Sequence, residues 1–196
     1  MLIDAFFGDP EIHPESFISR EAEIIGRVIV EKNVIIAPNV TLRADEGSPF
    51  CICEGANIQD GVIMHGLLDE FVEVRGERYS ICVGRDCSIA HDALVHGPCR
   101  LGAGTFLGFK SIVHKSDVGR GCFIGFGAVV NGVTIVDGRF VPDGSVVNEQ
   151  RLADALGPVP EAHRHFNDEV VEYNKKLVGL YLARQRSRAG KAQDAC

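Results

Sequence analysis

Three histidines, His65, His91 and His96, are the residues of this chain whose type and spacing could carry metal chemistry. Neutral imidazole nitrogens bind zinc with bonds of about 2.0–2.1 Å, and a set of three histidines leaves the ion an open position. An ion held in this way lowers the pKa of its bound water to about 7, which makes hydroxide available at neutral pH. The elements that carry the three histidines decide whether their side chains can meet.

A six-residue repeat runs through most of the chain and sets the direction of each side chain. Its core aliphatic positions are Ile24, Val30, Ile36, Leu42, Ile52, Ile58, Met64, Val83, Ile89, Val95, Leu101, Leu107 and Val113, then, after a one-residue slip, Val118, Ile124, Val130 and Val136. A fixed short period predicts a solenoid, and six residues suit a short strand and a turn. We therefore expect an all-β solenoid, a parallel β-helix. The hexads resemble those of left-handed triangular β-helix proteins, in which three hexads form one coil, and the handedness rests on that resemblance.

The repeat is interrupted and then ends, which outlines the organisation of the chain. Segment 66–80 carries charged residues where core residues should stand, so we expect a loop or hairpin there. After the repeat, the string GPVP at 157–160 marks a break. A stripe of Phe166, Val170, Asn174, Leu177 and Tyr181 then predicts an amphipathic α-helix packed on the flank of the solenoid. We expect a β-helix over residues 1–150 and a C-terminal helix and tail of the same domain over 151–196.

Composition restricts the partners and the location of the protein. Its 196 residues suffice for one sizeable core, and its net charge of −7 argues against a nucleic-acid partner. No apolar run approaches membrane-spanning length, and the first residues include acidic groups where a secretion signal is basic. We therefore expect a cytoplasmic protein with no membrane partner.

The seven cysteines fit the repeat better than they fit a disulfide framework. Cys87, Cys99 and Cys122 occupy the small-residue position four residues after a core aliphatic, where a thiol acts as a compact apolar group. The others lie on or beside expected strands or at the C-terminus, and no CxxC pair is present. We therefore predict that the chain has no thiolate zinc site.

Two of the three histidines fall in one outward column of side chains. A residue that directly follows a core aliphatic faces outward, because side chains alternate across a strand. Arg43, His65, His96 and His114 all occupy this position, and coils of eighteen residues bring them into register once the loops are subtracted. Neighbouring coils lie about 4.8 Å apart, so His65 and His96 can share one ion. We expect His114 to have a surface or supporting role.

His91 stands outside this column, two residues after Ile89 in the preceding hexad. Five residues of extended chain separate it from His96 by up to about 16 Å, so one chain would hardly bring both to one ion. A neighbouring chain could supply the missing ligand, and three-sided solenoids with such half-sites would close by three-fold packing. We predict a homotrimer with metal at its interfaces. The alternative is that the three histidines only decorate a polar surface.

Longer motifs around these histidines point to a family. The strings RADEG at 43–47, NIQDGVIMHG at 57–66 and SIAHDALVHGP at 88–98 resemble those of the γ-class carbonic anhydrases, which include the N-terminal domain of the carboxysome scaffold protein. The resemblance implies reversible hydration of CO2 to bicarbonate by a metal-bound hydroxide. It also implies that His65 and His96 of one chain and His91 of its neighbour hold the metal. We expect Zn2+, with Fe2+ and Co2+ as alternatives.

The same resemblance implies roles for further polar residues. Gln59 would orient the hydroxide, Glu46 would assist proton transfer, and Asn174 on the helix would help to form the CO2 pocket. Asn57 is a further catalytic candidate. Each residue also has a plain structural interpretation as part of a loop, turn or helix, and the role of Asn174 depends on the helix register alone.

Three charged residues are implied to stabilise the contact between chains. Arg43 and Asp60 would form a salt bridge across the interface, and Asp45 would lie nearby. The structural alternative is that these charges stabilise only their own chain.

Two other functions stay open beside the enzyme. Active archaeal members of the family carry a proton-shuttling glutamate three residues after the first metal histidine, and Leu68 stands there in this chain, followed by Asp69 and Glu70. The first alternative is therefore a weak or inactive trimeric assembly protein of the carboxysome type, with a carboxysome location. The second is a hexapeptide acyltransferase, which would need a groove for coenzyme A.

Overall fold

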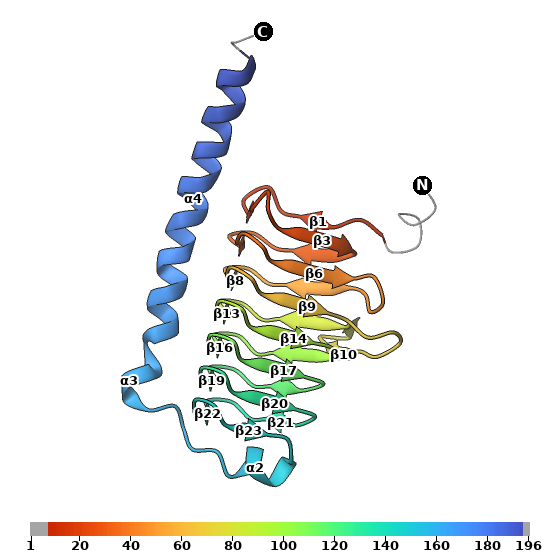
Figure 1. The fold of residues 1–196 in the computed structure, drawn as a ribbon, viewed down its shortest axis with the longest axis vertical. Helices are drawn as coiled ribbons and strands as arrows, with labels where there is room; N and C mark the ends of the chain where they lie inside the picture. Colours follow the sequence, from red (N-terminus) through yellow and green to blue (C-terminus); the bar gives the residue numbers. More distant parts are fainter. Residues whose placement is uncertain (1–7, 194–196) are drawn as a thin grey trace.

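Three parallel β-sheets form the three faces of a solenoid, and a long helix runs beside it (Figure 1). This computed structural model describes residues 8–193. Each face holds seven strands, and neighbours in a face come from successive coils, so every coil contributes one strand to each face. The prediction of a triangular parallel β-helix with a C-terminal helix on its flank is confirmed.

The strands are short because the chain turns a corner every few residues. Face 1 consists of β1 (Glu11–Ile12), β4 (Val28–Val30), β7 (Phe50–Ile52), β12 (Ile81–Val83), β15 (Cys99–Leu101), β18 (Asp117–Val118) and β21 (Thr134–Ile135). Face 2 consists of β2 (Phe17–Ile18), β5 (Ile35–Ile36), β8 (Asn57–Ile58), β13 (Ser88–Ile89), β16 (Phe106–Leu107), β19 (Phe123–Ile124) and β22 (Phe140–Val141). Face 3 consists of β3 (Glu23–Gly26), β6 (Thr41–Ala44), β9 (Ile63–His65), β14 (Leu94–His96), β17 (Ile112–His114), β20 (Val129–Asn131) and β23 (Val146–Val147).

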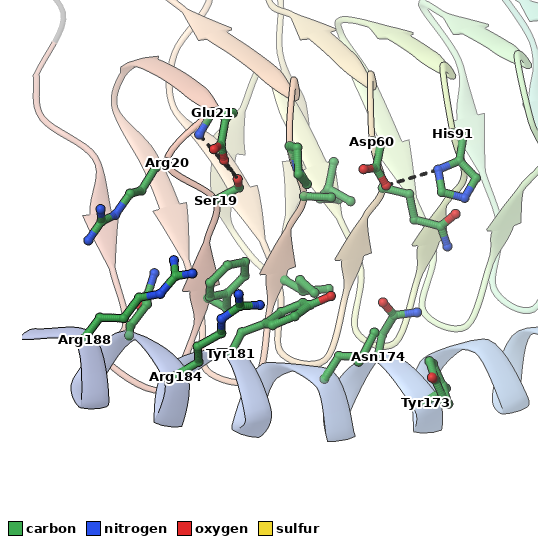
Figure 2. Close-up of a pocket in the computed structure, with 18 residues that line it drawn as sticks. Ser19, Arg20, Glu21, Asp60, His91, Tyr173, Asn174, Tyr181, Arg184 and Arg188 are labelled. Carbon is green, nitrogen blue, oxygen red and sulfur yellow. Dashed lines mark hydrogen bonds and ion pairs between the residues drawn. The ribbon is translucent and has the colours of Figure 1, made fainter.

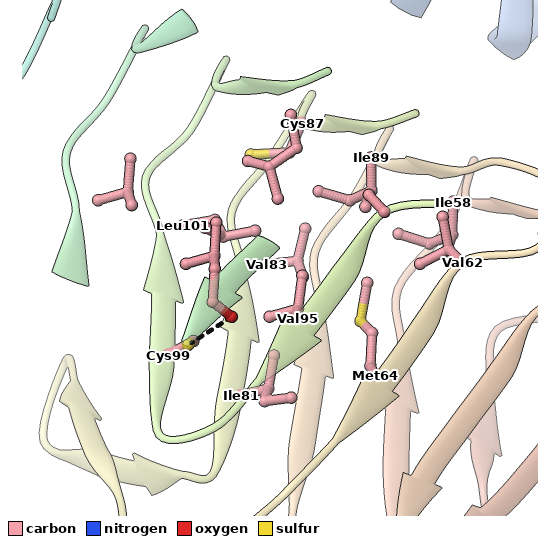
Figure 3. Packing of buried hydrophobic residues seen from close by; sticks show 14 of the residues in the cluster. Ile58, Val62, Met64, Ile81, Val83, Cys87, Ile89, Val95, Cys99 and Leu101 are labelled. Atoms are coloured by element: carbon pink, nitrogen blue, oxygen red, sulfur yellow. Dashed lines mark hydrogen bonds between the residues drawn. The ribbon is translucent and has the colours of Figure 1, made fainter. Parts of the chain in front are cut away.

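The aliphatic residues of the repeat fill the inside of the solenoid. Ile58, Met64, Ile89 and Val95 are completely buried there, and Figure 3 shows them facing one another from different strands. Burying one such side chain contributes about 1.5–3 kcal/mol, and the stack continues through successive coils. This repeated burial fixes which residues point outward, and it is what positions the outward histidines.

One position of the predicted repeat is wrong. Val136 is more than half exposed, and Ile135 takes the core position instead. The corner between β20 and β21 is one residue shorter than expected, with Gly132 at a φ of 69°. The preceding coil has the same short corner, with Lys115 at a φ of 46° between β17 and β18. The predicted slip after Val113 therefore occurs again one coil later.

A β-hairpin leaves the solenoid between β9 and β12, where the sequence predicts an excursion. Its strands β10 (Val72–Val74) and β11 (Glu77–Tyr79) are antiparallel. Arg75 and Gly76 form the two-residue turn, and both have positive φ, as a tight hairpin turn of the commonest kind requires. The hairpin packs against β12 on face 1.

Three helices follow the last coil: α2 (Gln150–Asp154), α3 (Glu161–Arg164) and α4 (Phe166–Gln193). The long helix α4 contacts β2, β5 and β13 and so covers face 2. Over residues 166–188 of α4, whose side chains the structure describes, the most buried are Asn167, Val171 and Val178, whereas Phe166 of the predicted stripe is partly exposed. The buried stripe is therefore displaced around the helix by about one residue. Asn167 explains part of this, since its Nδ2 donates to the carbonyl oxygens of Asp86 and Gly104 at 2.9 and 3.1 Å.

None of the helices in the described part of the chain is long and apolar enough to cross a lipid bilayer.

Candidate metal centre

The predicted column of outward side chains is present on face 3. Arg43 pairs in register with His65, His65 with His96, and His96 with His114, each on the next coil. The eighteen-residue count and the two subtracted excursions therefore give the correct register. This column places the two histidines on directly neighbouring strands, β9 and β14.

The imidazoles of His65 and His96 face each other closely. The Nδ1 of His65 and the Nε2 of His96 are 3.2 Å apart, and the rings meet edge to face. Two ligand atoms of a tetrahedral ion with bonds of about 2.0–2.1 Å are separated by about 3.3 Å, so this pair fits a shared ion. The other nitrogens, Nε2 of His65 and Nδ1 of His96, are buried without a hydrogen-bond partner among the described residues.

Electrostatics favour the neutral, metal-binding form of His96. Burial lowers its pKa, and the neighbouring His65 and His114 lower it further, while a backbone interaction at Gly97 opposes them. A neutral imidazole has a free lone pair, which is what a metal ion needs. His114 is instead engaged with Asn131, whose Oδ1 lies 2.7 Å from its Nδ1.

Two carboxylates approach the histidine pair from the loop after β6. The Nε2 of His65 lies 3.7 Å from Asp45 and 3.8 Å from Glu46. Asp45 is fixed by Arg43, whose Nη2 donates to it at 2.7 Å. Burial alone would raise the pKa of Asp45, but the hydrogen bonds from Arg43 and from the backbone outweigh it and hold the pKa below its usual range. We call Arg43, Asp45, Glu46, His65 and His96 the face-3 half-site.

His91 lies at the corner between β13 and β14 and does not join the pair within one chain. Among the described residues, His65, His91 and His96 do not form a group whose ligand atoms all lie within 4.8 Å of one another. The Nδ1 of His91 lies 3.3 Å from Asp60, and its ring stacks on Phe109. A carboxylate at one ring nitrogen is the usual way to orient a metal-binding histidine, and it leaves Nε2 for the ion. About half of the His91 side chain is exposed.

A cavity of about 520 Å³ between α4 and face 2 brings four predicted site residues together (Figure 2). Gln59, Asp60, His91 and Asn174 all line it. Asn174 reaches it from the helix, although its Nδ2 donates to the Val170 carbonyl within α4 at 2.8 Å. We call these four residues the corner half-site.

Asn57 supports this half-site from inside the fold. It is completely buried, and its Nδ2 donates to the Ser88 hydroxyl at 2.7 Å. Its Oδ1 accepts a hydrogen bond of 3.0 Å from the amide of Gln59. Asn57 therefore fixes the orientation of Gln59 and does not itself face solvent.

A cluster of three cysteines was missed by the sequence prediction. The Sγ atoms of Cys51, Cys53 and Cys82 lie within 4.8 Å of one another on face 1. The thiols of Cys51 and Cys82 lower the pKa of Cys53 by hydrogen bonding to it. The missed signal is the spacing: Cys51 and Cys82 are separated by the same interval as His65 and His96, one coil plus the hairpin excursion.

Known proteins resemble this chain in sequence and in fold. A carbonic anhydrase from Methanosarcina thermophila is 39% identical over 184 residues, which cover 88% of this chain and 74% of the relative. The carboxysome assembly protein CcmM of a Nostoc species is 40% identical over 181 residues, covering 92% of this chain, but the chain spans only 33% of that protein. No protein-family model matches the chain.

Among solved structures, a hexapeptide transferase family protein from Anaplasma phagocytophilum has a TM-score of 0.70 at 23% identity, covering 88% of this chain and 92% of that one. This likeness concerns the fold, which is the left-handed β-helix of hexapeptide-repeat proteins. The sequence identity to the Methanosarcina enzyme is the stronger evidence for the family, because the aligned region includes the strands that bear the histidines. The chain belongs to the γ-class carbonic anhydrase family.

Proposed function

We propose that the protein is a homotrimeric carbonic anhydrase that hydrates CO2 reversibly to bicarbonate at its subunit interfaces. Each interface would join the face-3 half-site of one chain to the corner half-site of the next. The pairing of His65 with His96 at 3.2 Å is the observation that carries this proposal. A single chain offers two of the three histidines on one face and the third around a corner, which three-fold packing would bring together.

The bound ion would supply a Lewis acid that lowers the pKa of water to about 7. His65 and His96 would hold it from one chain and His91 from the other, with Asp60 orienting His91 through Nδ1. Zn2+ is the ion we propose, and the same ligand set also accepts Fe2+ and Co2+.

The other polar residues of the two half-sites would orient the reacting oxygen, line the CO2 pocket, transfer protons and stabilise the interface. Gln59, held by Asn57, would present its amide to the reacting oxygen, and Asn174 would line the CO2 pocket. Glu46 lies beside His65 with a side chain that is more than half exposed, so it can pass a proton to solvent. Arg43 already holds Asp45, and we propose that Asp60 of the next chain completes this ion-pair network.

A second candidate function is that of a trimeric assembly protein with weak or no turnover. Leu68, at the position where a proton shuttle is expected, is about two-thirds exposed and cannot carry a proton. The similarity to the Nostoc assembly protein covers nearly the whole of this chain. In this case the metal would chiefly stabilise the trimer by linking its chains. The protein would then be located in a carboxysome.

The test is CO2 hydration measured by stopped flow on protein purified anaerobically and reloaded with zinc, beside His91→Ala. We expect a rate well above buffer that the variant loses. A metal-loaded trimer with no measurable CO2 hydration would contradict the enzymatic function and favour the assembly role.

A separate measurement tests the acyltransferase alternative. Acetyl-CoA should not stabilise the protein against unfolding, and a clear stabilisation would favour the acyltransferase.

A further inference from the structure

Three cysteine sulfurs meet on face 1, a different face from either half-site. Cys51 in β7 pairs in register with Cys82 in β12, and Cys53 follows Cys51 by two residues. Residues i and i+2 of a strand share one side, and paired residues of neighbouring strands lie side by side, so the backbone itself gathers the thiols. The Sγ atoms of Cys51 and Cys53 are 3.7 Å apart, and all three lie within 4.8 Å of one another.

The β10–β11 hairpin helps to enclose the cluster. Cys51 and Cys82 are only 7% and 3% exposed, although both point away from the solenoid core. The hairpin packs against β12, and Tyr79 at the end of β11 lies beside the thiols. Burial, followed by the Cys51 and Cys82 thiols, raises the pKa of the Tyr79 hydroxyl. Cys53 is the more accessible of the three cysteines.

Positive side chains surround the sulfurs. Arg75 of the hairpin turn and Arg85 lie near Cys53, and Arg100 stands next to Cys82 in register. Arg85 and Arg100 also pair with acidic residues, whereas Arg75 makes no ion pair with any residue that the structure describes. The thiols of Cys51 and Cys82, followed by Arg75 and Arg85, lower the pKa of Cys53. Hydrogen bonding to Cys53 and burial raise the pKa of Cys51, and they also raise the pKa of Cys82 against the opposing contact with Cys51. The thiolate is the metal-binding form of cysteine, so a cation bound here would displace the protons of Cys51 and Cys82.

We propose that Cys51, Cys53 and Cys82 bind a soft, thiophilic cation, Cu(I), through three sulfur ligands. Thiolates select Cu(I), zinc or iron–sulfur clusters. Structural zinc takes four ligands and iron–sulfur clusters take four cysteines. No fourth cysteine, histidine or carboxylate belongs to the group within residues 8–193. At a metal–sulfur bond length of about 2.3 Å, the value for zinc thiolates, three sulfurs around one ion lie about 4 Å apart. The Sγ atoms of Cys51 and Cys53 are 3.7 Å apart, and all three lie within 4.8 Å of one another.

The test is an anaerobic titration of the reduced chain with Cu(I) against a chromophoric copper chelator. One ion per chain should bind, and X-ray absorption should find three sulfur neighbours. Cys51→Ser, Cys53→Ser and Cys82→Ser should each weaken binding by more than about a hundredfold, beyond what residues that only orient ligands contribute. Cys122→Ser is the matched control, because the equivalent buried position one coil earlier holds a hydroxyl residue, Thr105.

Further variants separate this site from the histidines and from a folding defect. The His65→Ala/His96→Ala double variant should retain the copper, because its thiols are unchanged. Where Cys51→Ser or Cys82→Ser does not fold, Cys53→Ser carries the test, since this side chain is the least buried. Unchanged affinity in Cys53→Ser, or copper lost with the histidines, overturns the proposal. A reduced chain that binds no copper and instead forms a disulfide within the cluster overturns it as well.

Discussion

The Nδ1 of His65 lies 3.2 Å from the Nε2 of His96, across two strands that pair in register on neighbouring coils. This contact follows from the stacking of the core residues beneath it, because Met64 and Val95 are paired directly before the histidines. The same register places His114 one coil beyond, where it engages Asn131. The column therefore contains two candidate ligands, His65 and His96, and a third histidine, His114, that can serve as a control in mutagenesis.

Removing either histidine of the pair should abolish metal binding at neutral pH. In His65→Ala and His96→Ala, bound zinc measured by elemental analysis should fall from one ion per chain to near zero, since two ligands hold the ion too weakly. His114→Ala removes the neighbouring imidazole of the same column and should keep the metal. Equal metal loss in all three variants would show that the column binds ions non-specifically.

Because the half-sites belong to different chains, two inactive variants should complement each other. His65→Ala spoils only the face-3 half-site, and His91→Ala spoils only the corner half-site. A closed ring that contains both kinds of chain has one interface of the three with every ligand intact. Equal mixing during refolding should therefore restore about a quarter of the wild-type rate.

The control for this complementation is His65→Ala mixed with His96→Ala. Both changes affect the same half-site, so no interface in a mixed ring regains all three histidines. Activity recovered in this control, or none recovered with His91→Ala, would contradict a site shared between chains.

A glutamate at position 68 should speed proton removal. Leu68 is exposed beside acidic residues, one of which, Glu70, is already held by Lys115 at 2.8 Å. A positioned proton-transfer group typically contributes 10²–10⁴-fold, and we expect about tenfold for Leu68→Glu because Asp69 is close by in sequence. The gain should appear in stopped-flow rates at low buffer concentration and shrink at high buffer. Leu68→Gln, of the same size without the charge, should show no gain.

Asn57 should affect catalysis only through Gln59. It is buried and contacts the Gln59 amide at 3.0 Å, so Asn57→Ala frees that side chain to rotate. Misplacement of a positioning group costs up to about a hundredfold in rate, and kcat should fall while zinc content stays at one per chain. In a Gln59→Ala background the second substitution should have little further effect on kcat. Fully additive losses in this cycle would assign Asn57 a separate role.

Counting residues was enough to predict the column, because the coils from Arg43 to His114 each add eighteen residues once the two insertions are subtracted. The same count failed at Val136, because the corner at Gly132 is one residue shorter and places Ile135 in the core. Isoleucine and valine are both typical core residues, so the residue types at 135 and 136 do not indicate the shift. The helix stripe was displaced for a different reason, since a polar residue, Asn167, is buried through hydrogen bonds to backbone carbonyls. Hydrophobic patterns do not register such contacts.

A search for local sequence motifs could not have found the cysteine cluster. A CxxC search compares residues close in sequence, whereas Cys51 and Cys82 meet because they are paired across coils. The interval that predicted the histidine pair would have predicted this pair too. In a solenoid, the coil length is therefore the unit in which candidate ligands should be compared.

The core stack should be sensitive to single truncations even far from the histidines. Leu107 in β16 is completely buried, so Leu107→Ala should lower the free energy of unfolding by about 2–5 kcal/mol through lost burial and the remaining cavity. Leu180→Ala removes the same atoms from the exposed side of α4 and should change stability by less than about 0.5 kcal/mol. Denaturant unfolding at one fixed protein concentration makes the comparison valid for an oligomer. Similar losses in both variants would mean that the outer side of α4 is buried in the assembled protein.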